Sequence, residues 1–174
     1  METSAEVGAQ AADAGRVWLV LHVRPRAEKK AMDRLSRLGG FRYLPTYVKV
    51  TRVQRRKVRR ELPLFPGYVF AHLSADERAA MLRTNLVVNM IRDPFPRQTV
   101  RQLRQISRAA RLSPVVPSPR AFREGEPVRV KYGPLRGMSG YVQRAGAQAA
   151  LCINVDILGS SVLVSVSPAD LEPA

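Results

Sequence analysis

Residues 112–121 read LSPVVPSPRA, and this stretch divides the chain into two parts. It carries three prolines in ten positions, together with two serines. Proline removes the backbone donor that helices and central strands need, and it favours an extended, semi-rigid chain. The stretch shows neither helical nor strand periodicity, so it predicts a linker between two domains.

The segments on either side of this linker differ in charge. Residues 16–111 hold 23 Lys or Arg against six Asp or Glu, whereas residues 122–174 hold five of each. The formal net charge of the whole chain is +15, which points to a polyanionic partner. Because nearly all of the surplus lies upstream, we expect two domains with different partners.

Upstream of the linker, strand and helix patterns alternate. Four segments are predicted as strands: residues 17–23, 43–51, 64–73 and 86–91. Three helices are predicted: one over residues 27–38 that ends at Gly39-Gly40, one after the S-x-x-E capping box at Ser74, and one after Thr99-x-x-Gln102. The basic stretch 52–60 reads as a loop or hairpin tip. The order β-α-β-β-α-β-α predicts a mixed α+β sandwich with helices against one sheet.

Downstream of the linker, the pattern is all β. Short strands are predicted at residues 127–132, 140–143, 150–157 and 162–166, separated by glycine turns. This spacing predicts a small β-barrel. Within the third strand, residues 151, 153, 155 and 157 are expected in the core, and Cys152, Asn154 and Asp156 on the solvent side.

The composition argues against catalysis, metals and membranes. Cys152 is the only cysteine, and His22 and His72 are the only histidines, so a zinc site lacks ligands. No catalytic triad, phosphate-binding loop or paired carboxylates are evident, which predicts a protein without enzyme activity or cofactor. No apolar run reaches the roughly 20 residues of a membrane span. Residues 1–15 are acidic and Ala-rich, so we expect a disordered tail and a cytoplasmic protein.

Several motifs, in order along the chain, resemble the NusG family. They are Trp18-Leu-Val-Leu, PLFPGYVF at 63–70, FREGEPVRV at 122–130, GPLRGMSG at 133–140, VDILG at 155–159 and DLE at 170–172. The resemblance implies an NGN domain at 16–111, the linker at 112–121 and a KOW barrel at 122–174, after a tail at 1–15. The NGN domain is an RRM-like mixed sheet with flanking helices.

The resemblance also implies partners. The NGN domain of the family binds the clamp helices of the largest RNA polymerase subunit and favours continuous elongation. The KOW barrel contacts other factors, such as a small-subunit ribosomal protein or the termination factor Rho. The chain is accordingly expected to act as a monomer, without a membrane, in transcription elongation or antitermination.

Individual residues are carried over from the family to matching positions. Trp18, Phe65 and Tyr68 are expected to contact the polymerase, and Pro66-Gly67 is expected to leave Phe65 and Tyr68 partly exposed. Leu158 sits at the turn position with which the barrel touches its partners.

A second set of residues is expected to contact DNA. In the specialised, RfaH-like branch of the family, the first helix entrance meets the non-template strand, and here Arg24, Lys30 and Arg34 match it. From the basic stretch, Arg55, Arg56 and Lys57 are expected to attract the phosphate backbone of non-template or upstream DNA.

Three functions remain open at the level of sequence. MIRDPFP at 90–96 replaces the glycine-rich segment of the housekeeping protein, which favours a specialised, operon-specific antiterminator. The His-Thr-Thr stretch with which RfaH touches the polymerase gate loop is replaced by Arg78-Ala-Ala-Met81, so that contact is not implied. The alternatives are a housekeeping NusG that acts genome-wide and an RNA-binding or ribosome-associated KOW protein.

Overall fold

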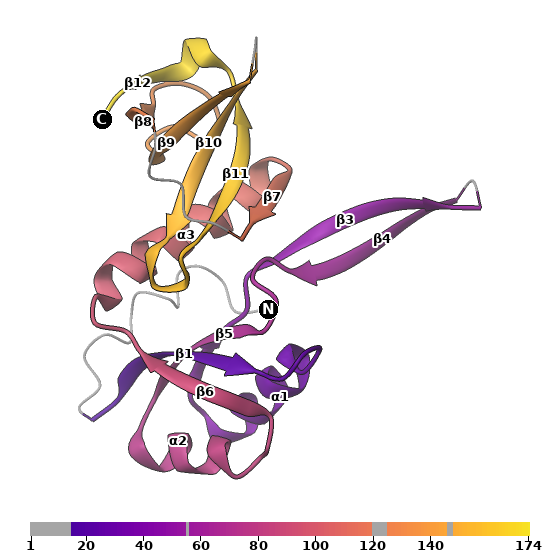
Figure 1. Cartoon of the computed structure of the whole chain (residues 1–174), viewed down its shortest axis with the longest axis vertical. Coiled ribbons are helices and arrows are strands. Elements are labelled where there is room, and N and C mark those ends of the chain that lie inside the picture. The colour runs from indigo at the N-terminus through magenta and orange to yellow at the C-terminus, as the bar shows by residue number, and fades with distance from the viewer. Residues whose placement is uncertain (1–14, 55, 120–124, 146–147) are drawn as a thin grey trace. The chain divides into compact units, whose positions relative to one another are not determined.

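The computed structural model describes residues 15–54, 56–119, 125–145 and 148–174 (Figure 1). The described residues form two compact units: 15–45 with 65–100, and 46–64 with 101–174. We call these unit 1 and unit 2. They are not the same segments as the domains expected at 16–111 and 122–174, which therefore stay a prediction.

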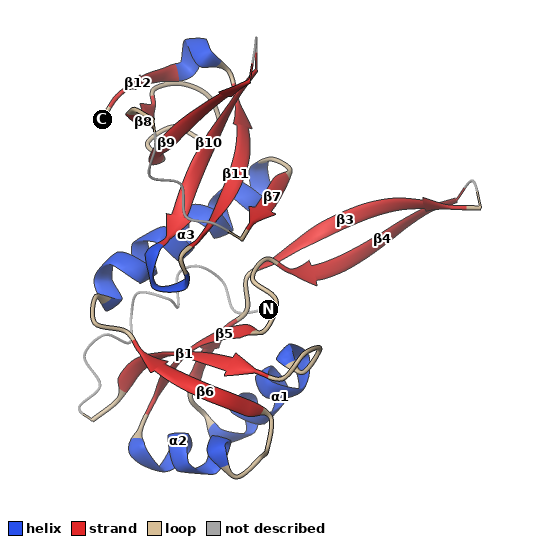
Figure 2. Cartoon of the chain, in the orientation of Figure 1, coloured by secondary structure: helices blue, strands red, loops and turns tan. Residues whose placement is uncertain are grey.

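Unit 1 contains a four-stranded antiparallel sheet with the order β2-β5-β1-β6. Its elements, in chain order, are β1 (Val17–Val23), α1 (Glu28–Leu38), β2 (Phe41–Tyr43), β5 (Tyr68–Leu73), α2 (Ala75–Leu82) and β6 (Val87–Arg92). Both helices lie on one side of the sheet (Figures 1 and 2). The core on this side joins Leu21 of β1, Leu35 of α1 and Met81 of α2, all of which are fully buried. The sequence expectation of a mixed α+β unit is confirmed.

The helix signals upstream of the linker are mostly confirmed. Ser74 and Glu77 form a complete capping box at the start of α2, with Ser74 N–H donating to the Glu77 carboxylate at 2.8 Å. Gly39 ends α1 with a left-handed φ of 82°, a conformation that glycine adopts without a steric penalty.

Unit 2 joins a two-stranded ribbon to a β-rich region. The ribbon consists of β3 (Thr46–Val53) and β4 (Arg56–Pro63). Helix α3 (Pro96–Leu112) begins in unit 1 and contributes its residues from Arg101 onward to unit 2. A six-stranded antiparallel sheet, β12-β8-β9-β10-β11-β7, completes the unit. Its strands are β7 (Val115–Ser118), β8 (Pro127–Val130), β9 (Ser139–Ala145), β10 (Gln148–Val155), β11 (Ser160–Val166) and β12 (Leu171–Pro173).

Three boundaries upstream of α3 differ from the expectation. The strand expected at 43–51 is split into β2 and β3, because Pro45 lacks the N–H that a continuous ladder needs. The stretch 52–60, expected as a loop or tip, is mostly paired strand, in register up to Val53 opposite Arg56. The strand expected from residue 64 begins only at Tyr68, because residues 64–67 form a turn that ends at Gly67 with φ 84°.

Three further features downstream also differ. Helix α3 starts at Pro96 rather than after Thr99, because proline is preorganised for the first helical position. Val115–Ser118, within the expected linker, forms β7 and pairs with β11. Cys152, expected on the solvent side, is fully buried, since its strand β10 is paired on both edges and packed on both faces.

Candidate protein- and nucleic-acid-binding surfaces

One face of the unit 1 sheet is lined with aromatic rings. The β1–β5 register places Trp18 opposite His72, Val20 opposite Phe70 and His22 opposite Tyr68, so their side chains share the face that α1 and α2 leave free. Trp18 stacks on His72 with ring centroids 5.1 Å apart, and His22 stacks on Tyr68 at 5.0 Å. We call this the aromatic face; its members are Trp18, His22, Phe41, Phe65, Tyr68, Phe70 and His72.

The three residues expected to contact polymerase meet on the aromatic face, but their exposure differs from the expectation. Phe65, expected to be partly exposed, is only 4% exposed, because the 64–67 turn folds its ring edge-on to Phe70 with centroids 6.4 Å apart. Trp18 is also buried, at 8% exposure, whereas Tyr68 is half-buried. Tyr68 is therefore the ring of this trio that offers surface to a partner. The polymerase contact itself stays a prediction.

A carboxylate holds this turn in place. Glu28, in the first turn of α1, is 7% exposed and accepts a hydrogen bond from Gly67 N–H at 2.7 Å. A second bond, from Tyr68 N–H to the Phe65 carbonyl at 3.1 Å, closes the turn. The start of α1 thus fixes the segment that orients Phe65 and Tyr68.

A cationic groove lies beside α1 in the same unit. It has a volume of about 470 Å³ and is lined by Lys30, Asp33, Arg34, Arg37, Arg83, Thr84 and Leu86. Lys30, Arg34 and Arg37 lie four and three residues apart, which places them on one helix face. Four cations against one carboxylate make the groove suited to anions. We call it the α1 groove.

Arg24 is tied to the rim of the α1 groove. Its backbone N–H donates to the Leu86 carbonyl at 2.9 Å, and its guanidinium donates to the Asn85 side-chain oxygen at 2.7 Å. Nearby Arg26 has a left-handed φ of 63°, which is uncommon for a residue with a side chain. The structure thus brings together Lys30 and Arg34 in the groove, with Arg24 bonded to its lining residue Leu86. Contact of these three residues with DNA stays a prediction.

Two cations of the groove, Arg37 and Arg83, are not among the DNA contacts predicted from the sequence. Arg37 follows Arg34 by three residues, so helical spacing alone could have included it. Arg83 lies after α2, and only the fold brings it beside α1. No local sequence signal connects the two segments.

The basic ribbon β3–β4 carries the remaining candidates. Arg56 and Lys57 are exposed at the start of β4, whereas Arg55 lies outside the described residues. Residues 46–63 hold seven Lys or Arg and one acid, Glu61, which accepts a hydrogen bond from the Thr46 hydroxyl at 2.7 Å. The ribbon is therefore strongly cationic.

Leu158 lies in a short 3₁₀ turn of unit 2. The turn spans Asp156–Leu158, and Gly159 follows it with a left-handed φ of 60°. Leu158 is half-buried. A half-buried leucine at a rigid turn is compatible with partner binding, and that role stays a prediction.

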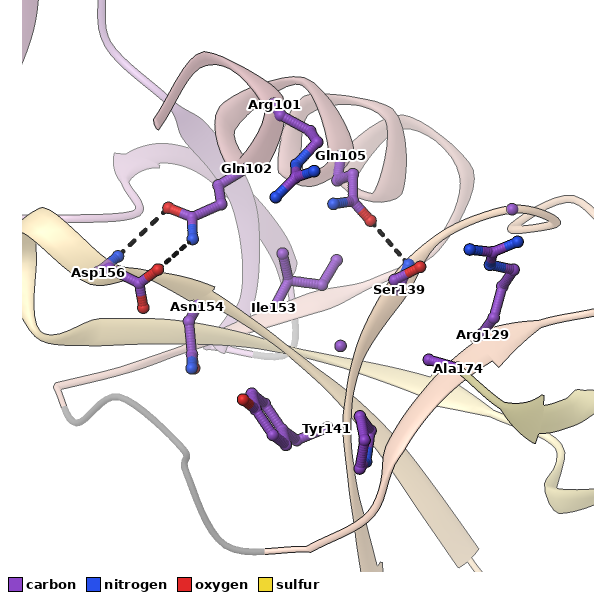
Figure 3. A pocket seen from close by; sticks show the side chains of 13 residues that line it. Arg101, Gln102, Gln105, Arg129, Ser139, Tyr141, Ile153, Asn154, Asp156 and Ala174 are labelled. Carbon is purple, nitrogen blue, oxygen red and sulfur yellow. Dashed lines mark hydrogen bonds between the residues drawn. The ribbon is translucent and has the colours of Figure 1, made fainter. Parts of the chain in front are cut away.

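Helix α3 borders a pocket of about 560 Å³ next to this turn (Figure 3). The Gln102 amide donates to the Asp156 carboxylate, and Asp156 N–H donates back to the Gln102 oxygen at 3.3 Å. Ser139 N–H donates to the Gln105 oxygen at 2.8 Å. These contacts tie the second half of α3 to the sheet within unit 2. Asp156, which forms two of these hydrogen bonds, is also the first residue of the Asp156–Leu158 turn.

The described residues form no metal-ligand cluster, and the Cys152 thiol is buried. No group of three or more His, Cys, Asp or Glu among them is arranged to hold a metal ion. Burial raises the pKa of the Cys152 thiol to about 11, so near neutral pH it stays protonated and is a poor nucleophile. Among the described helices, none has the length and apolar character needed to cross a membrane.

The chain thus combines a mixed α+β unit, which carries an aromatic face and a cationic groove, with an antiparallel β region. A family model described as "Transcription termination factor nusG" matches residues 16–111. The chain belongs to the NusG family, whose members are transcription factors without enzyme activity.

The fold is similar to that of a solved structure. The structure "Domain interaction in Thermotoga maritima NusG" is similar at a TM-score of 0.50 and 17% identity, over 91% of this chain and 97% of that one. The "MjSpt4:Spt5 complex conformation A" matches at 12% identity over 90% of this chain and 97% of that chain, with a TM-score of 0.28. A search of curated proteins found no match. The expected fold class, α+β followed by an all-antiparallel β region, is confirmed.

Proposed function

We propose that this chain is an operon-specific elongation and antitermination factor that binds RNA polymerase and holds non-template DNA in the α1 groove. The observation that carries the proposal is the convergence of Lys30, Arg34, Arg37 and Arg83 on one groove of about 470 Å³. Arg24 reaches the rim of the same groove through Asn85 and Leu86.

The groove suits a nucleic acid strand for two reasons. Its volume falls in the range of roughly 300–1,000 Å³ that accommodates a nucleotide-sized ligand. Its cations are supplied by two separate segments, α1 and the loop after α2, so they can hold a phosphate from both sides. Lys30 also stands in the first turn of α1, where a cation opposes the helix dipole, and a bound phosphate offsets that cost.

The polymerase contact is proposed at the edge of the aromatic face. Tyr68 is half-buried, and its ring stacks on His22 at 5.0 Å, so it is held rigidly while part of it stays accessible. Rigid aromatic residues are common anchors at protein interfaces. Phe65 and Trp18, which are buried, support the shape of this face rather than present surface to the clamp helices of the largest subunit.

The remaining partners are proposed for unit 2. Phosphates of upstream DNA are proposed to meet Arg56 and Lys57 of the basic ribbon, with Arg55 beside them in sequence. Leu158 is proposed to contact a small-subunit ribosomal protein or Rho. The boundaries 16–111, 112–121 and 122–174 and a monomeric state are part of the same proposal.

The test of the groove is a reconstituted elongation complex with a defined non-template strand. The paired variant Lys30→Ala/Arg34→Ala should lose most of the crosslinking to that strand and most of the pause suppression, while it still binds polymerase. Lys131→Ala/Arg136→Ala removes the same charge from exposed positions in unit 2 and serves as the control. Unchanged crosslinking in the groove variant would show that the α1 groove does not hold the non-template strand.

A separate experiment distinguishes the operon-specific role from a housekeeping one. Chromatin immunoprecipitation of the tagged chain should show occupancy confined to one or a few operons. Occupancy across most transcribed genes would instead identify a general factor. Tight RNA binding by the chain without polymerase, measured by filter binding, would favour a ribosome-associated or RNA-binding role.

A further inference from the structure

The basic ribbon carries opposed like charges on both of its faces. The register places Lys49 directly opposite Arg60, and Arg52 directly opposite Lys57. Because successive side chains alternate between the faces of a strand, the pair at Lys49 and the pair at Arg52 point to opposite faces. All four side chains are exposed.

This arrangement opposes the stability of the ribbon. Like charges directly across a ladder destabilise the pairing, and a two-stranded ribbon by itself is only marginally stable in water. β3 and β4 pair with each other and with no other strand in the described part of the chain. No ion pair with a described acidic residue offsets the charge of these four side chains. Residues that destabilise their own fold are generally retained because they serve a functional site, such as one that binds a ligand.

The base of the ribbon borders a pocket of unit 2. Tyr47, Val48, Val50 and Arg59 share a pocket of about 340 Å³ with residues 110–115 of unit 2. None of the four opposed cations lines that pocket, so both charged pairs remain available to a ligand.

We propose that the basic ribbon enters the major groove of B-form duplex DNA, with one charged face toward each phosphate strand. The eight-residue strands span about 27 Å, and the major groove, about 12 Å wide, admits a two-stranded ribbon. A groove supplies phosphates on two sides, which matches cations on two faces. A single strand offers one backbone, and the major groove of A-form RNA is too narrow.

The inference rests on the proposed function for its setting, since upstream duplex DNA is the duplex nearest to a factor on a transcribing polymerase. It goes further in naming the geometry of the contact. It is tested without polymerase, so its failure leaves the polymerase and non-template contacts untouched.

The experiment measures binding of the full chain to a fluorescent 20-base-pair DNA duplex by anisotropy, over a series of salt concentrations. Lys49→Thr/Arg60→Thr removes the pair on one face, and Arg52→Thr/Lys57→Thr removes the pair on the other. Each should weaken binding at least about tenfold at 0.15 M salt and lower the salt slope by nearly two, at about 0.9 for each lost phosphate contact. Lys131→Thr/Arg136→Thr should change neither quantity.

Threonine suits strands, and each substitution removes a repulsion, so the ribbon is not expected to unfold in either variant. A single-stranded DNA probe and an RNA duplex should bind more weakly than the DNA duplex and lose less affinity in each variant. A loss confined to one face would show a one-sided contact and overturn the proposal. Equal affinity for the RNA duplex, or variants that bind like the control, would also overturn it.

Discussion

The contact between Glu28 and the 64–67 turn gives the most informative perturbation of unit 1. The Glu28 carboxylate is 7% exposed and accepts the Gly67 N–H at 2.7 Å. Glu28→Ala leaves this buried N–H without its acceptor. Hydrogen bonds to charged groups contribute about 1.5–3 kcal/mol, so we expect the free energy of unfolding of unit 1 to fall by about 2 kcal/mol. Alanine is the better helix former, so helix propensity does not explain such a loss.

The assay follows urea unfolding through tryptophan fluorescence. Trp18 is the only tryptophan of the chain and lies in β1, next to the strand that the turn leads into, so its signal reports on unit 1. Glu28→Gln keeps an acceptor oxygen and should lose only about 1 kcal/mol. Glu126→Ala, at an exposed carboxylate in unit 2, serves as the control and should be neutral.

The functional consequence follows from the position of the turn. Tyr68 is the first residue after the turn, so loss of the Glu28–Gly67 bond should also loosen the position of the Tyr68 ring. Glu28→Ala should therefore weaken polymerase binding even under conditions in which unit 1 is folded. A loss of stability below about 0.5 kcal/mol would refute the reasoning, because the hydrogen bond would then have no structural role.

Three further predictions concern other parts of the fold. Ser74→Ala removes one half of the capping box of α2 and should lower stability by about 1 kcal/mol in the same urea assay. Gly140→Ala should destabilise unit 2 by about 3 kcal/mol in thermal unfolding followed by circular dichroism, because a Cβ there collides with the Cys152 carbonyl; an unchanged melting temperature contradicts this. Cys152, with its pKa raised to about 11 by burial, should resist a thiol reagent at pH 8 and react as the pH rises toward 11 or as unit 2 unfolds.

Local signals explain which parts of the fold could be predicted from the sequence. The capping box at Ser74 and the glycine end of α1 are set by a few neighbouring residues, and both were predicted correctly. The predicted ends of β3 and β4 were wrong because cross-strand pairing extends through the basic stretch. The predicted start of α3 was wrong because the helix begins at Pro96, before the Thr99 motif.

The candidate surfaces show the same limit. Lys30 and Arg34 share a helix face, so their proximity followed from spacing, whereas Arg83 joins them only through the packing of α2 against α1. The burial of Phe65 depends on its contact with Phe70 and on the Glu28–Gly67 bond, neither of which has a signature in the LFPG sequence. The burial of Cys152 likewise depends on packing over both faces of β10, since the consecutive residues Leu151, Cys152 and Ile153 are all buried.

The central claim is that the chain attaches to RNA polymerase through the exposed edge of its aromatic face. The most direct measurement is the dissociation constant of the full chain for the isolated clamp-helix fragment, at low and at physiological salt. We predict binding that is weakened at least tenfold by Tyr68→Ala and much less by Lys30→Ala, which should mainly change the salt dependence. No affinity for the fragment in low salt, or equal binding by Tyr68→Ala and the unaltered chain, would contradict the account.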